Sequence, residues 1–165
     1  MQDLDPSRVV IVGNSGAGKS TLAERLAQEH DLARLDLDTI AWDPGPARRP
    51  LERSQAELEA FTAQHPRWVI EGCYADLAEL LRDQATLLVF LDPGVERCLA
   101  HNAARPWEPH KYASKEAQDR NLDMLQTWVR GYAERDDACS LGAHEALFAE
   151  WTGAKRRVAD GDEVG

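Results

Sequence analysis

The stretch that decides the fold is residues 9–20, VVIVGNSGAGKS, near the start of a chain of 165 residues. The unbroken apolar run Val9 to Val12 predicts a buried strand, and residues 19–29 have the spacing of a helix. The glycines between them fit the pattern G-x-x-x-x-G-K-[ST] of a phosphate-binding loop. In such a loop several backbone N–H groups point at one anion, and the helix N-terminus adds partial positive charge.

The residues of this loop have expected roles in holding a nucleotide. Lys19 would reach the terminal phosphates, and the Ser20 hydroxyl would be a ligand of Mg²⁺. The alternative is a glycine-rich turn that joins a strand to a helix and binds nothing. We expect phosphate contacts from Gly13, Asn14, Ser15, Gly16, Ala17, Gly18, Lys19, Ser20 and Thr21.

Apolar and helical segments alternate along the rest of the chain. The pattern predicts strands at residues 33–37, 68–70, 86–91 and 155–158 (with a loop as the alternative for 35–38) and helices at 51–64, 74–82, 95–103, 114–136 and 141–151. Residues 42–50 hold three prolines and a glycine, which indicates a loop. The alternation predicts one α/β domain over residues 1–165, with a five-stranded parallel sheet between helices.

Composition and charge indicate a globular domain and argue against several other classes of protein. The 43% hydrophobic and 29% charged fractions are those of a globular domain, and the net charge of −10 argues against a nucleic-acid partner. No apolar run approaches the ~20 residues of a membrane span, and residues 1–8 lack the pattern of a signal peptide. Three widely spaced cysteines indicate buried thiols in a reducing cytoplasm. The acidic residues near the C-terminus predict a disordered tail at about residues 160–165.

Carboxylates follow three of the predicted strands, at the sheet edge where ligands bind. Asp36 and Asp38 share one side of a strand that continues through them, so Asp36 could serve Mg²⁺ through water while Asp38 orients or deprotonates an acceptor hydroxyl. Turn or helix-cap roles are the alternative. Glu71 is a second candidate for the metal, or a structural carboxylate. Asp92 is its rival, although DPG at residues 92–94 also has the form of a helix start.

Residues 105–112, RPWEPHKY, hold two prolines and cannot form a regular helix. The cationic side chains in or beside this segment are Arg105, His110, Lys111 and Arg120. A mobile cationic lid at about residues 105–120 would exclude water and stabilise transition-state charge, with Arg105 and Arg120 on the phosphates. A surface loop packed on its aromatic residues is the alternative. Arg48 and Arg49 could hold an anionic acceptor, or form a solvated pair.

Taken together, these residues resemble the small P-loop kinases of the adenylate kinase and shikimate kinase group over most of the chain. The segment LDLDTI at 35–40 looks like the Asp-x-Asp of shikimate kinases, whose first Asp serves magnesium and whose second serves the acceptor hydroxyl. VIEG at 69–72 is similar to the strand-three Asp-Gly of adenylate kinases, and residues 91–97 with Arg105 look like the stretch that leads into their lid. Residues 38–42 and 70–74 are closer still to bacterial topology-modulation-type P-loop proteins.

The resemblance implies a three-layer P-loop NTPase fold like that of nucleoside-monophosphate kinases, with a small lid. It implies ATP- and Mg²⁺-dependent phosphoryl transfer to a small-molecule acceptor by a cytoplasmic monomer or homodimer, with Lys19, Asp38 and Arg105 as catalytic residues. The acceptor stays open, because ECG at 71–73 departs from the Gly-Gly-Gly of shikimate kinases and lacks the Pro and Arg of adenylate kinases. Alternatives are a nucleotide-dependent switch or NTPase acting on a protein partner, and a nucleotide-binding module without turnover.

Overall fold

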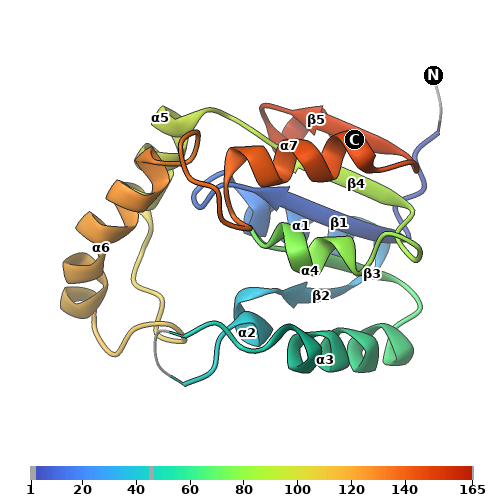
Figure 1. Cartoon of the computed structure of the whole chain (residues 1–165), viewed down its shortest axis with the longest axis horizontal. Helices are drawn as coiled ribbons and strands as arrows, with labels where there is room; N and C mark the ends of the chain where they lie inside the picture. Colours follow the sequence, from blue (N-terminus) through green and yellow to red (C-terminus); the bar gives the residue numbers. More distant parts are fainter. Residues whose placement is uncertain (1–2, 45–46, 165) are drawn as a thin grey trace.

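The computed structural model describes residues 3–44 and 47–164 and arranges them as a parallel sheet between two layers of helices (Figure 1). Neighbouring strands pair in parallel in the order β2-β3-β1-β4-β5. The strands are β1 (Arg8–Gly13), β2 (Ala33–Asp36), β3 (Trp68–Glu71), β4 (Leu87–Leu91) and β5 (Lys155–Val158). This confirms the predicted α/β class and five-stranded sheet. Because β1 is central, the loop that follows it lies between the ends of β3 and β4.

Both faces of the sheet are buried, which explains the unbroken apolar runs of its central strands. Val10 and Val12 of β1 pack with one helical layer, and Val9 and Ile11 with the other, because successive side chains alternate across a strand. The helices are α1 (Lys19–His30), α2 (Asp38–Ala41), α3 (Leu51–Gln64), α4 (Ala75–Glu79), α5 (Val95–Ala104), α6 (Lys115–Arg130) and α7 (Leu141–Glu150). Side chains of α3, α4 and α7 cover the first face, and those of α1, α5 and α6 cover the second.

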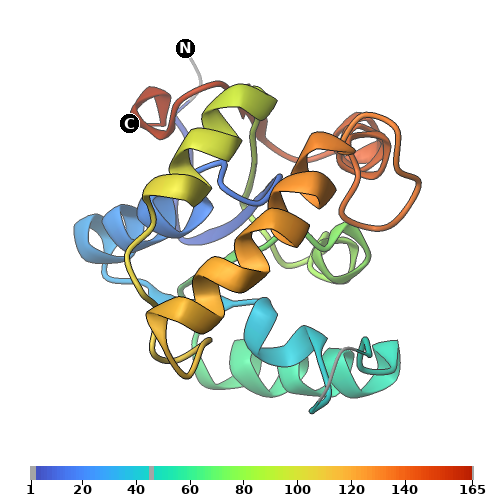
Figure 2. The same cartoon turned by 90° about the vertical axis from the view of Figure 1, so that its left-hand side faces the viewer.

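Residues 105–114 join α5 to α6 without regular helix, as the prolines predict. Figure 2 looks at the edge where the carboxyl ends of the strands lie, and α6 runs obliquely across this edge. The helix ends at Arg130 rather than Asp136, because the Gly131 amide closes its last turn on the carbonyls of Thr127 and Trp128. The predicted helix at 74–82 is regular only within α4.

The predicted disorder of the tail is wrong for residues 160–164. They form a short 3₁₀ turn, η1 (Gly161–Glu163), closed by a capping box between Asp160 and Glu163. Val164 is 2% exposed and packs in the core on the α1 side, and Arg25 of α1 donates to the carbonyls of Gly161 (2.7 Å) and Val164 (2.6 Å). Burial of a valine and these charge-assisted bonds order the turn despite its acidic composition. Residue 165, and residues 45–46 of the predicted loop at 42–50, lie outside the described residues.

Within residues 3–44 and 47–164, no helix combines the length and the apolar character needed to cross a bilayer. The three cysteines are buried and free, as predicted.

Candidate functional site: a phosphate-binding loop and its carboxylates

Glycines shape the loop between β1 and α1. Gly16 and Gly18 have φ angles of 85° and 99°, in the left-handed region that strains other residues. A Cβ on Gly13 would lie 2.4 Å from the Leu91 carbonyl oxygen, so only glycine fits where the loop passes β4. The helix α1 begins at Lys19 with no acidic residue in its first turn, so its positive end is free to attract an anion.

Two side chains of α5 brace this loop from outside. Asn102 Nδ2 donates to the Ser15 carbonyl at 3.4 Å, and His101 Nδ1 lies 2.7 Å from the Gly16 carbonyl oxygen. Asn102 is buried, and a Cβ on Gly16 would strike its amide group at 2.8 Å. Sequence reasoning missed both residues, because 85 and 87 residues separate them from their partners and no local pattern marks them.

Lys19 lies within the loop rather than in solvent. Its ammonium donates to the Asn14 carbonyl at 2.7 Å, and the residue is 8% exposed. Asn14 also donates from its side chain to the Val129 carbonyl of α6 at 3.4 Å, so part of its role is structural. The charge of Lys19 opposes the rise in pKa that burial causes at Glu71 and Asp36. Lys19 therefore lies between the phosphate-binding loop and the carboxylates of Asp36 and Glu71.

Ser20, Asp36 and Glu71 meet at one corner of the loop. Ser20 Oγ donates to Glu71 Oε1 at 3.1 Å, and the β2–β3 register places Asp36 beside Glu71. Burial raises the pKa of Glu71, and burial together with repulsion from Asp38 raises the pKa of Asp36. A hydroxyl and two carboxylates are the hard oxygen donors that Mg²⁺ takes beside phosphate, so this corner fits that ion.

Among the residues that the structure describes, no three His, Cys, Asp or Glu side chains form a closed metal cage. Asp92, the third candidate, accepts a bond from Arg157 at 2.8 Å. The Asp92 carboxylate thus pairs with Arg157 of β5, whereas the Glu71 carboxylate contacts Ser20 of the phosphate-binding loop.

Asp38 is the first residue of α2 rather than a continuation of strand β2, and its carboxylate is held from both sides. The Tyr74 hydroxyl donates to its Oδ1 at 2.5 Å, and Lys111 Nζ donates to its Oδ2 at 3.2 Å. Trp42 Nε1 donates in turn to the Tyr74 hydroxyl at 2.7 Å. Burial disfavours the charged form of Asp38, but Lys111 and Tyr74 outweigh it and bring its pKa below the usual value. Asp38 is therefore a carboxylate at neutral pH.

The structure does not bring the two expected lid arginines to the phosphate-binding loop. Arg105 forms an ion pair with Glu108 in its own segment, at 3.8 Å. Arg120 is exposed on α6, and its side chain makes no hydrogen bond or ion pair within residues 3–44 and 47–164. Lys111, which we expected only as part of a cationic lid, instead lies beside Asp36 and Asp38.

Arg48 and Arg49 are paired with carboxylates of the chain. Arg48 lies over the Tyr74 ring at 4.7 Å and contacts Asp76 at 3.2 Å. Arg49 is 2.7 Å from Glu57. Both guanidinium groups thus pair with carboxylates of the chain, rather than forming an open anion site or a solvated pair.

The sequence profile of the AAA domain family (AAA_33) matches residues 9–135, which include the loop and the carboxylates described above. The chain belongs to this family. The search of curated proteins found no match to its sequence.

Two solved structures resemble this AAA domain. An unliganded sugar kinase from Janibacter sp. HTCC2649 is 19% identical, with 96% of this chain and 90% of that chain covered and a TM-score of 0.51. A shikimate kinase from Acinetobacter baumannii in complex with shikimate is 23% identical, with 84% and 89% covered and a TM-score of 0.44. The likeness to the sugar kinase agrees with the parallel α/β fold of this AAA domain, as its sequence predicted.

Tyr74 contributes to the site of this AAA domain through its bond to Asp38, a role that sequence reasoning missed. Tyr74 follows β3 by three positions, and the rule that ligands bind beyond strand ends could have drawn attention to it. Its contact with Asp38, 36 residues away, depends on how α2 packs beside the end of β3.

Proposed function

We propose that this protein transfers the γ-phosphoryl group of ATP, with Mg²⁺, to a hydroxyl of a small-molecule acceptor. The observation that carries the proposal is the position of Asp38. It lies beside the corner of Ser20, Asp36 and Glu71, as an ionised carboxylate with two partners. One edge of the sheet therefore offers groups for both the donor and the acceptor.

The donor half uses the phosphate-binding loop. Its N–H groups and the start of α1 would bind the phosphates, and Lys19 would turn from the Asn14 carbonyl to the oxygens that gain charge. Ser20 and Glu71, with Asp36 through water, would hold Mg²⁺. When bound, that ion neutralises charge on the β- and γ-phosphates.

The acceptor half uses Asp38. Its carboxylate would accept a hydrogen bond from the acceptor hydroxyl and take up the proton as the new O–P bond forms, while the bond from the γ-phosphorus to the bridging oxygen breaks and ADP leaves. Lys111 and Tyr74 hold the side chain in place for that contact. Arg105 would have to leave Glu108 to reach the phosphates, which requires closure of residues 105–114 over the site.

The test is a screen for phosphorylated products from a metabolite library with ATP and Mg²⁺, read by mass spectrometry. Lys19→Ala should lower turnover at least about a hundredfold, because a preorganised charge at the phosphates is lost. Asp38→Asn should keep nucleotide binding and lose transfer by roughly a hundredfold or more. Lys115→Ala, which removes an exposed lysine paired with Asp119, is the matched control.

The outcomes separate the proposal from its rivals. Wild-type turnover by Lys19→Ala would sink it. Slow ATP hydrolysis that no acceptor changes would favour a switch or NTPase acting on a protein partner. Tight nucleotide binding without turnover would favour a binding module. A cytoplasmic location belongs to the same proposal, because buried free thiols suit a reducing compartment. We propose a monomer or a homodimer as the oligomeric state.

A further inference from the structure

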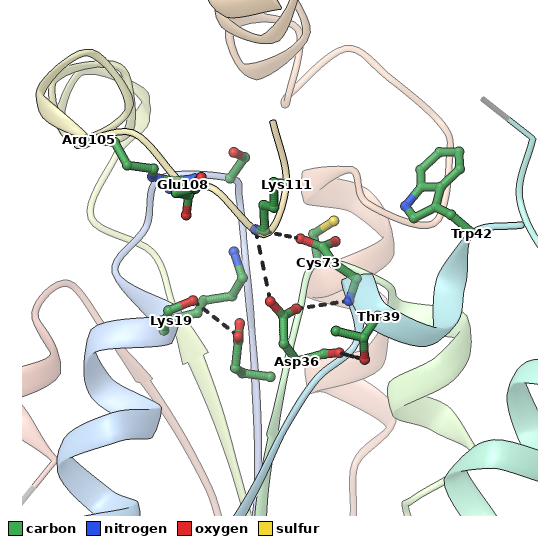
Figure 3. A network of polar contacts seen from close by, with 12 residues as sticks. Lys19, Asp36, Thr39, Trp42, Cys73, Arg105, Glu108 and Lys111 are labelled. Carbon is green, nitrogen blue, oxygen red and sulfur yellow. Dashed lines mark hydrogen bonds and ion pairs between the residues drawn. The ribbon is translucent and has the colours of Figure 1, made fainter. Parts of the chain in front are cut away.

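The loop of residues 105–114 reaches across the site through one side chain. Lys111 Nζ lies 3.2 Å from Asp38 Oδ2 and 3.9 Å from Asp36 Oδ2, although 73 residues separate Lys111 from Asp38. Figure 3 shows Lys111 extending from this loop toward Asp36, with Lys19 approaching from the phosphate-binding loop. Its side chain is 28% exposed, so the contact is partly shielded from water.

Other contacts of the 105–114 loop tie it to the start of α6. Gln118 Oε1 accepts from the Glu108 amide at 2.8 Å, and Asn121 Nδ2 donates to the Tyr112 hydroxyl at 2.9 Å. Within residues 3–44 and 47–164, the bonds of Lys111 are the only hydrogen bonds and ion pairs that join this loop to anything beyond α5 and α6. Loss of Lys111 would therefore detach the loop from the β2 side.

The two carboxylates need a positive charge between them. The ammonium of Lys111 lies near one oxygen of each carboxylate, 3.2 Å from Asp38 Oδ2 and 3.9 Å from Asp36 Oδ2. In the ligand-free protein the ammonium thus supplies charge that a divalent cation at Asp36 would otherwise supply.

We propose that Lys111 is a positioning residue that fastens the 105–114 loop over the acceptor side of the site, and that a divalent cation competes with its ammonium for Asp36. The roles of Asp36 and Asp38 in this proposal rest on the proposed function. The closer contact, with Asp38, holds the loop after a cation takes Asp36, so the loop stays near the acceptor carboxylate while the metal corner is filled. Through Lys111, the binding of a cation at Asp36 thereby affects how the 105–114 loop is attached to the site.

The experiment compares full-length Lys111→Met with Lys115→Met and wild type, all without nucleotide or acceptor. Lys115 is the matched control, since it lies four residues further on and pairs with exposed Asp119. Hydrogen exchange of residues 105–114 should become about tenfold faster in Lys111→Met, because the contact that closes the loop is gone. Manganese(II) alone, followed by electron paramagnetic resonance, should bind Lys111→Met several-fold more tightly, because the competing ammonium is removed. Neither quantity should change in Lys115→Met.

A second variant removes the other partner of the contact, so that an effect of the methionine itself can be distinguished from loss of the contact. Asp38→Asn should also speed exchange of the loop, because it removes the acceptor of the shorter contact. Unchanged loop exchange in Lys111→Met, or manganese affinity no tighter than that of wild type, would overturn the proposal. If both shifts occur while no acceptor is phosphorylated, the proposed function fails and the role of Lys111 in the loop stands.

Discussion

At the scale of single residues, two carboxylates two positions apart have opposite environments. Asp36 is pushed toward its neutral form by burial and by its neighbour, whereas the Lys111 and Tyr74 contacts keep Asp38 ionised. Opposed pKa shifts in one site are the usual way that two carboxylates take different tasks. The charge of Asp38 is thus better compensated within the chain than the charge of Asp36.

A buried histidine makes stability depend on pH. His144 is fully buried, its Nε2–H donates to the Cys73 carbonyl at 2.6 Å, and burial lowers its pKa to about 4. The unfolded chain, with a histidine pKa near 6.5, binds more protons between these values. Stability should therefore be complete above about pH 6.5 and fall by up to about 3 kcal/mol as the pH drops to about 4.

Urea unfolding at pH 4 to 8 measures this dependence. His144→Gln should flatten the curve in that window, and exposed His110→Gln should leave it as in wild type. The same slope in wild type and His144→Gln would contradict the assignment.

At the scale of elements, the ends of β2 and β3 set the spacing of the carboxylates. A Cβ on Gly72 would lie 2.7 Å from Leu37 Cβ, and Leu37 is the fully buried residue between Asp36 and Asp38. The Leu37 amide donates to the Glu71 carbonyl at 2.9 Å, so the two strand ends move together. A close backbone approach at Gly72 therefore positions three carboxylates at once.

Gly72→Ala should force Leu37 away and destabilise the fold by about 1–3 kcal/mol, the usual cost of overpacking a core. Because the displacement moves Asp36 and Asp38, phosphoryl transfer should fall by a larger factor than nucleotide affinity. Chemical denaturation and parallel binding and turnover assays measure the two effects. Gly142→Ala in α7 is the control, since its Cβ would meet no atom within 4 Å. Equal stability of the two variants would show that the strand ends tolerate the methyl group.

At the scale of the whole molecule, the sheet and the segment that crosses its edge differ in how they are held. The central strands are buried on both faces, whereas residues 105–125 lie along the edge of the sheet and are half-buried or exposed (Figure 2). Val129 of α6 is buried in the core on the α1 side, so the end of α6 is anchored and its start is not. The central sheet is thus firmly packed, whereas residues 105–125 are more loosely attached to it.

Hydrogen exchange across the whole chain should reflect this division. Amides of β1, β3 and β4 should exchange only by global unfolding, and residues 105–125 should exchange by local opening, orders of magnitude faster. A non-hydrolysable ATP analogue with Mg²⁺ should slow exchange of residues 13–21 and 105–125, because in the proposed function both segments close on the phosphates. Protection confined to residues 13–21 would mean that the edge segment takes no part in nucleotide binding.

Local sequence by itself determined the frame of this protein and its phosphate-binding loop. The apolar run at Val9–Val12, the glycines after it and Lys19 and Ser20 predict a strand, a loop and a helix, because backbone freedom and side-chain periodicity are local properties. The carboxylates at 36, 38 and 71 follow from the rule that parallel strands end at one edge.

Only the tertiary structure decided which charges meet. Lys111 pairs with Asp38, and Arg25 donates to the ordered end of the chain, through contacts between segments distant in sequence. The packing of the helices on the sheet determines which charged groups come together. It also determines how far each group is buried, and burial is a property of the assembled molecule. That is why the phosphate-binding loop could be predicted from a short stretch of sequence, whereas the partners of Asp38 could not.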